Sequence, residues 1–227
     1  MRHIIKSGVL SAAVLLSANV LATVLDTEAQ KLGYIIGMDI GNSLKQQGAE
    51  VDIDTLVEAV KATYTGAELA MTPEEAATIR EEYIAARRAE AEAAQQSLAA
   101  DNAAAGDKFL LENRGRDGVQ VTDSGLQYEV IEMGDGPMPS AEDTVTVHYR
   151  GTLLDGTEFD SSYSRNQEAT FKLNQVIPGW TEGLQLMPVG STFKFFIPAN
   201  LAYGPNGPPS IGPNATLIFD VELIDVQ

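Results

Sequence analysis

The sequence from Val145 to Phe171 reads VTVHYRGTLLDGTEFDSSYSRNQEATF, and KLNQVIPGWTEGL continues it to Leu184. This stretch gathers aromatic and aliphatic side chains around one carboxylate: Tyr149, Phe159, Asp160, Phe171, Val176, Ile177 and Trp180. It contains no nucleophile–base pair, no metal-ligand cluster and no phosphate-binding loop. Because apolar side chains with a few convergent polar groups are typical of ligand pockets, the stretch predicts a site that binds an apolar group and does little bond-breaking chemistry.

Residues on both sides of this stretch alternate between apolar and polar side chains, which is the pattern of half-buried strands. Strands are predicted at 126–131, 145–149, 192–198 and 217–226. Turn signals lie at Asp155-Gly156 and in the Gly- and Pro-rich run 204–213. One short helix fits, at about 180–186, closed by Pro188 and Gly190. Residues 119–227 therefore predict an antiparallel sheet wrapped on one short helix.

Two helices are predicted within residues 26–70. The first, 27–47, has apolar residues at helical spacing and a glycine ladder at Gly33, Gly37 and Gly41. Each glycine costs a helix about 1 kcal/mol relative to alanine, so three on one face require a compensating close approach of another backbone. A helix–helix interface between chains is the favoured interpretation, and packing within the chain is the alternative. Two helices bury too little core alone, which predicts a homodimer.

A third helix is predicted from residue 72 to about 115, because Thr72, Pro73 and Glu75 form an N-terminal capping signature. Large apolar residues are few along it, which is typical of a solvent-exposed connector rather than a coiled coil. Gly106 is a point where this helix could bend, and residues 109–111 are expected to dock one end onto a domain.

The first 22 residues have the features of a secretory signal peptide. Arg2 and Lys6 precede an apolar run to Leu21, and Ala22 precedes the expected cleavage site. The alternative, a membrane anchor, is disfavoured because the run is short and interrupted by polar residues, so no membrane span is expected in the mature protein. The net charge is −17, and removal of Arg2 and Lys6 makes it −19, which argues against nucleic acid as a partner.

The order and spacing of the pocket residues over about 100 residues resemble the FKBP-type peptidyl-prolyl cis–trans isomerases. The N-terminal part resembles the secreted, dimeric Mip-like (macrophage infectivity potentiator-like) branch of that family. The resemblance implies an α+β fold, with a C-terminal FKBP-like antiparallel half-barrel wrapped on one short helix. A long connecting helix and an all-α N-terminal dimerisation module precede it. The expected parts are a signal peptide (1–22), a helical dimerisation domain (26–70), a connecting helix (72–115) and an isomerase domain (119–227).

The resemblance also implies the roles of individual residues. Asp160 is expected at the pocket edge, hydrogen-bonded to the Tyr149 hydroxyl, and the Tyr203 hydroxyl is expected to donate to the substrate amide region. The implied substrate-binding residues surround the pocket. They are Trp180 at its floor, Phe159 and Phe171 at its walls, Val176 and Ile177 along one side, Ile211 on the flap, and Phe219 at the back. Each aromatic residue taken alone is more typical of a core, and the joint pattern favours a site.

Three features depart from the family pattern. Ala169 stands where small cytosolic relatives often have an aromatic residue, which implies a wider wall and weaker binding of bulky macrolides. Pro208-Pro209 occupies the flap, which implies a stiffer flap. Ile211 aligns with the family's flap isoleucine only through a gap.

The expected activity is isomerisation of Xaa-Pro bonds in folding polypeptides by stabilising the twisted amide, with no cofactor and no metal. The two histidines are His3, in the leader, and His148, which faces away from Tyr149 on a strand. Macrolide inhibitors are expected to bind the pocket. Secretion across the inner membrane to the periplasm is expected, with outer-membrane association as the alternative location. The alternative function is a holdase chaperone or binding module that uses the cleft between the arms of the dimer.

Overall fold

The computed structural model describes residues 24–227, so the predicted signal peptide lies outside the described residues. The chain forms two compact units, one ending at Pro73 and the other running from Glu74 to Gln227. Each is described by itself.

The first unit contains α1 (Glu28–Gln46) and α2 (Ile53–Thr65). Thr27 caps α1 in a capping box with Gln30, and the Asp52 carboxylate accepts a 2.8 Å hydrogen bond from the Thr55 amide at the start of α2. Gly48 follows α1 with a φ of 60°, a left-handed conformation that suits glycine. Local capping chemistry therefore sets the bounds of both helices.

No residue of α1 or α2 is buried in the single chain. Exposed fractions of 40–59% are found for six of the large apolar side chains of α1: Leu32, Tyr34, Ile35, Ile36, Met38 and Ile40. A Cβ added to Gly33, Gly37 or Gly41 would meet no other atom within 4 Å. The close approach that would compensate for three helical glycines is therefore not made by any described residue of the same chain.

The helix α3 (Pro73–Asn113) is continuous over 41 residues, and at about 1.5 Å per residue it is about 60 Å long. The helix is not interrupted at Gly106, the position at which the sequence indicated a possible bend. Gly106 is buried because it lies against Thr216, and a Cβ at this position would collide with the Thr216 hydroxyl oxygen. Of the three residues expected to dock, Phe109 packs on Phe196 with ring centroids 5.8 Å apart, whereas Leu111 is 60% exposed.

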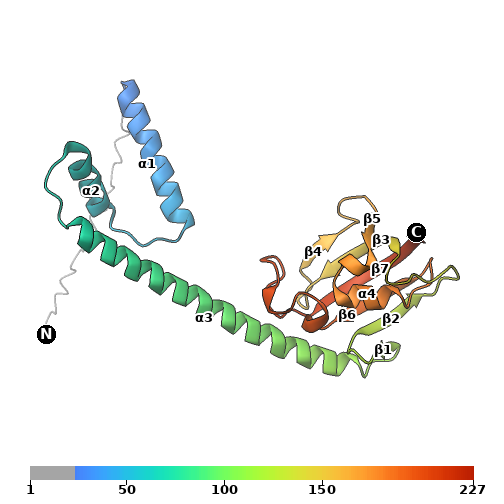
Figure 1. Ribbon diagram of the computed structural model, residues 1–227. Helices are drawn as coiled ribbons and strands as arrows, with labels where there is room; N and C mark the ends of the chain where they lie inside the picture. Colours follow the sequence, from blue (N-terminus) through green and yellow to red (C-terminus); the bar gives the residue numbers. More distant parts are fainter. Residues whose placement is uncertain (1–23) are drawn as a thin grey trace, which may run out of the picture. The chain divides into compact units, whose positions relative to one another are not determined.

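The last turn of α3 ends beside β1 (Figure 1), and a buried amide network ties it to the sheet. The Asn113 side chain donates to the Gln127 side-chain oxygen at 2.9 Å, and the Gln127 amide donates to the Leu110 carbonyl oxygen at 2.8 Å. Asn113 and Gln127 are 2% and 4% exposed, so these paired amides are largely removed from water. The C-terminal end of α3 and the sheet thus form one packed body.

The sheet has seven strands, all paired antiparallel, in the order β1-β2-β6-β7-β3-β4, with β5 also paired to β3. The strands are β1 (Val119–Val121), β2 (Gln127–Glu132), β3 (Thr144–Thr152), β4 (Glu158–Ser161), β5 (Ala169–Lys172), β6 (Thr192–Ile197) and β7 (Leu217–Val226). The helix α4 (Pro178–Leu184) begins two residues before the predicted start. Short 3-10 turns span Leu173–Gln175, Ala199–Leu201 and Gly204–Asn206.

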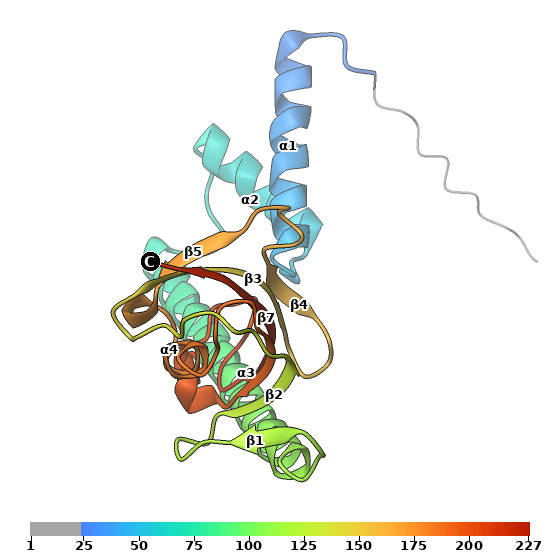
Figure 2. The ribbon, with the colours of Figure 1, turned by 90° about the vertical axis from the view of Figure 1, so that its right-hand side faces the viewer.

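The sheet curves around α4, as Figure 2 shows. Alternate residues of β3 and β7, among them Val147 and Val221, point inward and pack against Leu184 of α4; none of the three is more than 1% exposed. Gly183 allows close packing, because a Cβ there would lie 2.6 Å from the Phe195 ring. The α+β architecture predicted from the sequence, a half-barrel on a short helix preceded by helices, is confirmed.

Candidate functional site

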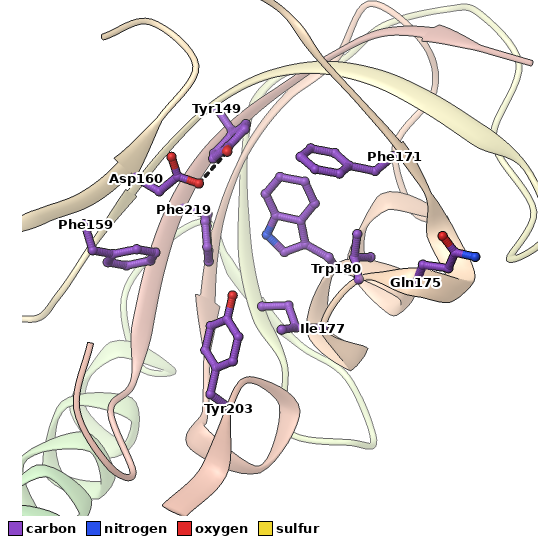
Figure 3. Close-up of a pocket in the computed structure, with 10 residues that line it drawn as sticks. Tyr149, Phe159, Asp160, Phe171, Gln175, Ile177, Trp180, Tyr203 and Phe219 are labelled. Carbon is purple, nitrogen blue, oxygen red and sulfur yellow. Dashed lines mark hydrogen bonds between the residues drawn. The ribbon is translucent and has the colours of Figure 1, made fainter. Parts of the chain in front are cut away.

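A pocket of about 460 Å³ opens between α4 and the inner faces of β3, β4, β5 and β7 (Figure 3). Its lining residues are Tyr149, Phe159, Asp160, Phe171, Gln175, Val176, Ile177, Trp180, Tyr203 and Phe219. Strand alternation explains part of this set, because Tyr149 and Phe219 lie on neighbouring strands and both face α4.

Trp180, in the first turn of α4, forms the floor and is 4% exposed. Three rings stand edge-to-face around its indole at centroid distances of 5.2–5.6 Å: Tyr149, Phe171 and Phe219. This is the favoured geometry for aromatic pairs. The Trp180 ring nitrogen is buried and has no hydrogen-bond partner among the described residues. The floor is therefore rigid and apolar.

Polar groups converge at one edge of the pocket. The Tyr149 hydroxyl donates to Asp160 Oδ2 at 2.5 Å, and Arg165 donates to Asp160 Oδ1. Arg165 also donates to the Tyr149 hydroxyl oxygen at 2.9 Å, and its guanidinium lies 5.7 Å from the centre of the Tyr149 ring. Three residues from β3, β4 and the loop after β4 thus form a closed network.

Burial raises the pKa of Asp160, but the hydrogen bonds from Tyr149 and Arg165 outweigh it, so this pKa lies below its usual value. Burial, and then the hydrogen bond to Asp160, raise the pKa of Tyr149 above its usual value. At neutral pH Asp160 is therefore ionised and Tyr149 is protonated. Neither group is poised to exchange a proton near pH 7, so the network suits orientation and electrostatics better than acid–base catalysis.

Two further polar groups border the apolar floor. The Ile177 carbonyl accepts the hydrogen bonds that open α4, whereas its own amide N–H donates to no partner within residues 24–227. Tyr203 stands at the mouth with 44% of its surface exposed, and its hydroxyl points into the pocket in Figure 3. The pocket can therefore hold an apolar ring and offer hydrogen-bond donors to a carbonyl beside it.

The structure brings together nine of the ten site residues named from the sequence, together with Gln175. Ile211 is the exception, because it lies in the core and lines a second cavity of about 230 Å³ beside α3. The reason is a local turn, in which the Pro208 carbonyl oxygen accepts from the amides of Ile211 and Gly212 at 2.8 Å. Ile211 therefore does not line the pocket in this structure, and its role as a flap residue stays a prediction.

Sequence reasoning missed Arg165 and Gln175. Both lie in irregular segments, a loop and a 3-10 turn, where no periodicity in the sequence indicates which way a side chain faces. His148 faces away from the pocket as predicted. Its Nδ1 lies 2.8 Å from the Ser162 hydroxyl, and its ring stacks on Tyr163 at 4.6 Å.

Comparison with known proteins identifies both halves of the chain. Residues 136–224 match the family of FKBP-type peptidyl-prolyl cis-trans isomerases, and residues 29–130 match the domain found amino-terminal to such isomerases. The chain is 47% identical over 208 residues to the outer membrane protein MIP of Legionella longbeachae, covering 91% of this chain and 89% of the relative. It is 40% identical over 219 residues to the isomerase FkpA of Escherichia coli K12, covering 91% and 81%.

The crystal structure of FkpA from Escherichia coli superposes on this fold with a TM-score of 0.73 at 40% identity, covering 90% of this chain and 99% of that one. Sequence and structure therefore agree over nearly the whole length, including the helical part. The chain belongs to the FKBP-type peptidyl-prolyl cis-trans isomerases and is an enzyme of that activity.

Proposed function

We propose that the pocket around Trp180 is the site at which this isomerase catalyses the cis–trans isomerisation of Xaa-Pro bonds in folding polypeptides. The observation that carries the proposal is the combination of an apolar aromatic floor with a polar edge at which, near neutral pH, Asp160 stays ionised and Tyr149 stays protonated. Rotation about an amide moves no proton and breaks no covalent bond, so it needs a site of this kind.

The mechanism follows from how the barrier arises. Amide resonance gives a rotation barrier of about 18–20 kcal/mol, and resonance is lost in the twisted transition state. Water favours the polar planar form, so a pocket that strips water from the carbonyl of the Xaa-Pro amide favours the twisted one. The aromatic and aliphatic side chains that line the pocket offer water few hydrogen-bond partners near the proline ring. Catalysis is then differential binding without a covalent intermediate.

The roles of individual residues follow their places in the pocket. Trp180 lies beneath the proline ring of the substrate. The ring is also contacted by the other apolar side chains that line the pocket: Phe159, Phe171, Val176, Ile177 and Phe219. The Ile177 amide binds a carbonyl of the substrate or of a macrolide inhibitor, and Tyr203 donates its hydroxyl to the amide region. Asp160 holds the Tyr149 hydroxyl in place at the edge.

The first test is the exchange rate of a short Leu-Pro or Phe-Pro peptide with residues 23–227, measured by NMR without a coupled protease. Uncatalysed exchange takes tens to hundreds of seconds, and we expect micromolar protein to shorten it by at least about tenfold. A macrolide should suppress this acceleration competitively. Folded protein that leaves the exchange rate unchanged would contradict the assignment of the pocket.

The pH dependence tests the network separately. Because the folded-state pKa of Asp160 is depressed, its contribution is present above the unfolded pKa of about 3.9 and is lost as pH falls through the lower folded value. We expect kcat/KM to be nearly flat from about pH 5 to 8. In Arg165→Met the pKa of Asp160 should rise, so the acid limb of the profile should move to higher pH.

The effect of Arg165→Met at pH 7 should be no more than about fivefold in kcat/KM, because exposed ion pairs contribute about 0–1 kcal/mol. Lys172→Met removes a cation outside the network and should leave the profile unchanged. Far-UV circular dichroism at each pH separates titration from unfolding. An acid limb at the same pH in wild type and Arg165→Met would exclude the network as its origin.

We further propose that residues 26–70 form a dimerisation domain, residues 72–115 a connecting helix and residues 119–227 the isomerase domain. The support is the exposed apolar surface of α1 and its open glycine face, which a second copy of the chain would cover. Two isomerase domains in one dimer could bind a single unfolded chain at two points, which strengthens binding without new contacts.

We propose that residues 1–22 direct secretion to the periplasm. Outer-membrane association is the alternative, and the relative from Legionella longbeachae is named an outer membrane protein. Over the described part of the chain, no helix combines the length and apolar character needed to cross a membrane. Fractionation of cells, with the amino-terminal sequence of the exported protein, decides between these locations.

A further inference from the structure

The loop formed by residues 204–216 joins two parts of the pocket. Tyr203 directly precedes it, and β7, which carries Phe219, directly follows it. Its base is closed by a main-chain hydrogen bond of 2.8 Å from the Asn214 amide to the Gly204 carbonyl oxygen. Because Gly204 is the neighbour of Tyr203, a displacement of the loop at Asn214 is transmitted to the backbone beside Tyr203.

The long helix α3 holds this loop by two amide side chains. Asn102 Nδ2 donates to the Pro213 carbonyl oxygen at 2.8 Å, and Asn214 Nδ2 donates to the Ala99 carbonyl oxygen at 3.5 Å. Asn214 has a φ of 52°, a left-handed conformation that few residues other than glycine adopt. The same residue thus closes the loop with its main chain and binds the helix with its side chain.

Close packing adds to these hydrogen bonds at Gly106. Thr216, at the end of the loop, is 4% exposed, and its hydroxyl oxygen occupies the space that a side chain at position 106 would need. Leu98, Asn102 and Gly106 are spaced four residues apart, so they lie on one face of α3. Leu98 and Asn102 also border Gly212, at 3.7 Å and 3.5 Å from the place of a Cβ there. One face of α3 therefore lies along the loop from Gly212 to Thr216.

We propose that the last turns of α3 are part of the isomerase unit, with Asn102 and Gly106 acting as positioning residues that fix loop 204–216 and, through it, Tyr203 at the pocket mouth. This inference rests on the proposed function of the pocket. The connecting helix then does more than separate two domains. It sets the shape of the mouth through which the substrate amide reaches Tyr203, although no residue of α3 lines the pocket.

The decisive variants are Gly106→Ala and Asn102→Ala in the mature chain. The added methyl group must displace Thr216, and the lost amide frees the Pro213 carbonyl. We expect each variant to lower kcat/KM on a short Phe-Pro peptide about three- to tenfold, a loss comparable to that of one modest hydrogen bond. We also expect the amide and ring signals of Tyr203 to shift in NMR spectra. Gln96→Ala, which removes an exposed amide from the same helix, should change neither.

A second-site change separates positioning from a general loss of stability. In Gly106→Ala/Thr216→Ala the colliding hydroxyl is absent, and the nearest remaining atom of residue 216 is its Cβ, 3.4 Å from the new methyl group. We expect the double variant to recover most of the activity and the wild-type Tyr203 signals. Thr216→Ala alone should stay close to wild type in both.

The outcome that overturns the proposal is a lower thermal midpoint in Gly106→Ala and Asn102→Ala with unchanged kcat/KM at 10 °C and unchanged Tyr203 signals. Asn102→Ala keeps the test valid if Gly106→Ala does not fold. Inactive wild-type protein would instead contradict the proposed function. In that case the Tyr203 signals alone decide whether α3 positions the mouth, because they report the conformation without any turnover.

Discussion

Replacing Asp160 with alanine is expected to lower kcat/KM on short Xaa-Pro peptides by about 10- to 100-fold, because hydrogen bonds to a charged group contribute about 1.5–3 kcal/mol. The Asp160 carboxylate accepts from both the Tyr149 hydroxyl and Arg165. Its removal leaves the Tyr149 hydroxyl with no carboxylate acceptor at the pocket edge and lets Arg165 move. Peptide exchange by NMR at pH 7 measures the loss.

The control for this variant is Glu158→Ala, which removes a carboxylate of the same strand. Glu158 binds Arg150 at 2.8 Å and Ser164 at 2.7 Å, and it does not line the pocket. We expect it to change kcat/KM less than about twofold, as for an exposed ion pair. Equal losses in Glu158→Ala and Asp160→Ala would show that the strand, and not the pocket carboxylate, is responsible.

Tyr149→Phe extends the argument by removing the other end of the hydrogen bond while keeping the aromatic wall. If the two residues act as one unit, Asp160→Ala combined with Tyr149→Phe should cost less than the sum of the single losses. Additive losses would mean that each group contacts the substrate independently. That result would contradict the role of Asp160 as the group that holds the Tyr149 hydroxyl.

The fold could be predicted from the sequence where local chemistry determines it. The helix bounds near Thr27, Asp52 and Gly48 follow from capping residues whose interactions reach only three or four positions along the chain. The long strand β7 was predicted with both ends correct, because its apolar residues alternate over ten positions. In these segments the chemistry of neighbouring residues is sufficient.

Long-range packing explains what the sequence did not reveal. The strands β4 and β5 have four residues each, which is too short for a clear alternation, and both are positioned by pairing with β3. Arg165 enters the site because a loop folds back over Tyr149. Gly106 looked like a weak point of a helix, since the partner that requires a glycine there, Thr216, is distant in sequence.

If α1 forms the proposed dimer interface, replacing Gly37 with leucine is expected to abolish the homodimer or weaken it more than tenfold, as measured by sedimentation equilibrium of the mature protein. Leucine favours helix over glycine by up to about 1 kcal/mol, so α1 itself should become more stable. The open face around Gly37 would nevertheless lose the close approach of a second backbone. A weaker dimer combined with a more stable helix would therefore point to the interface.

The matched control is Asn42→Leu, which adds the same side chain about 140° around the helix from Gly37, at 100° per residue. We expect this variant to remain dimeric. Short-peptide activity should change less than about twofold in both variants, because each isomerase domain retains its own pocket. Refolding of a proline-limited protein substrate should slow by about tenfold or more in Gly37→Leu, since linkage of two binding sites can raise avidity 10²- to 10⁴-fold.

The two activities together separate the roles of the two ends of the chain. If Gly37→Leu lost short-peptide activity in a folded monomer, the pocket would depend on the dimer, and the division into a binding half and a catalytic half would be wrong. If refolding of the protein substrate were unchanged in the monomer, two-point binding would have no part in the function. The exposed apolar surface of α1 would then require another partner, because large exposed apolar patches mark interaction sites.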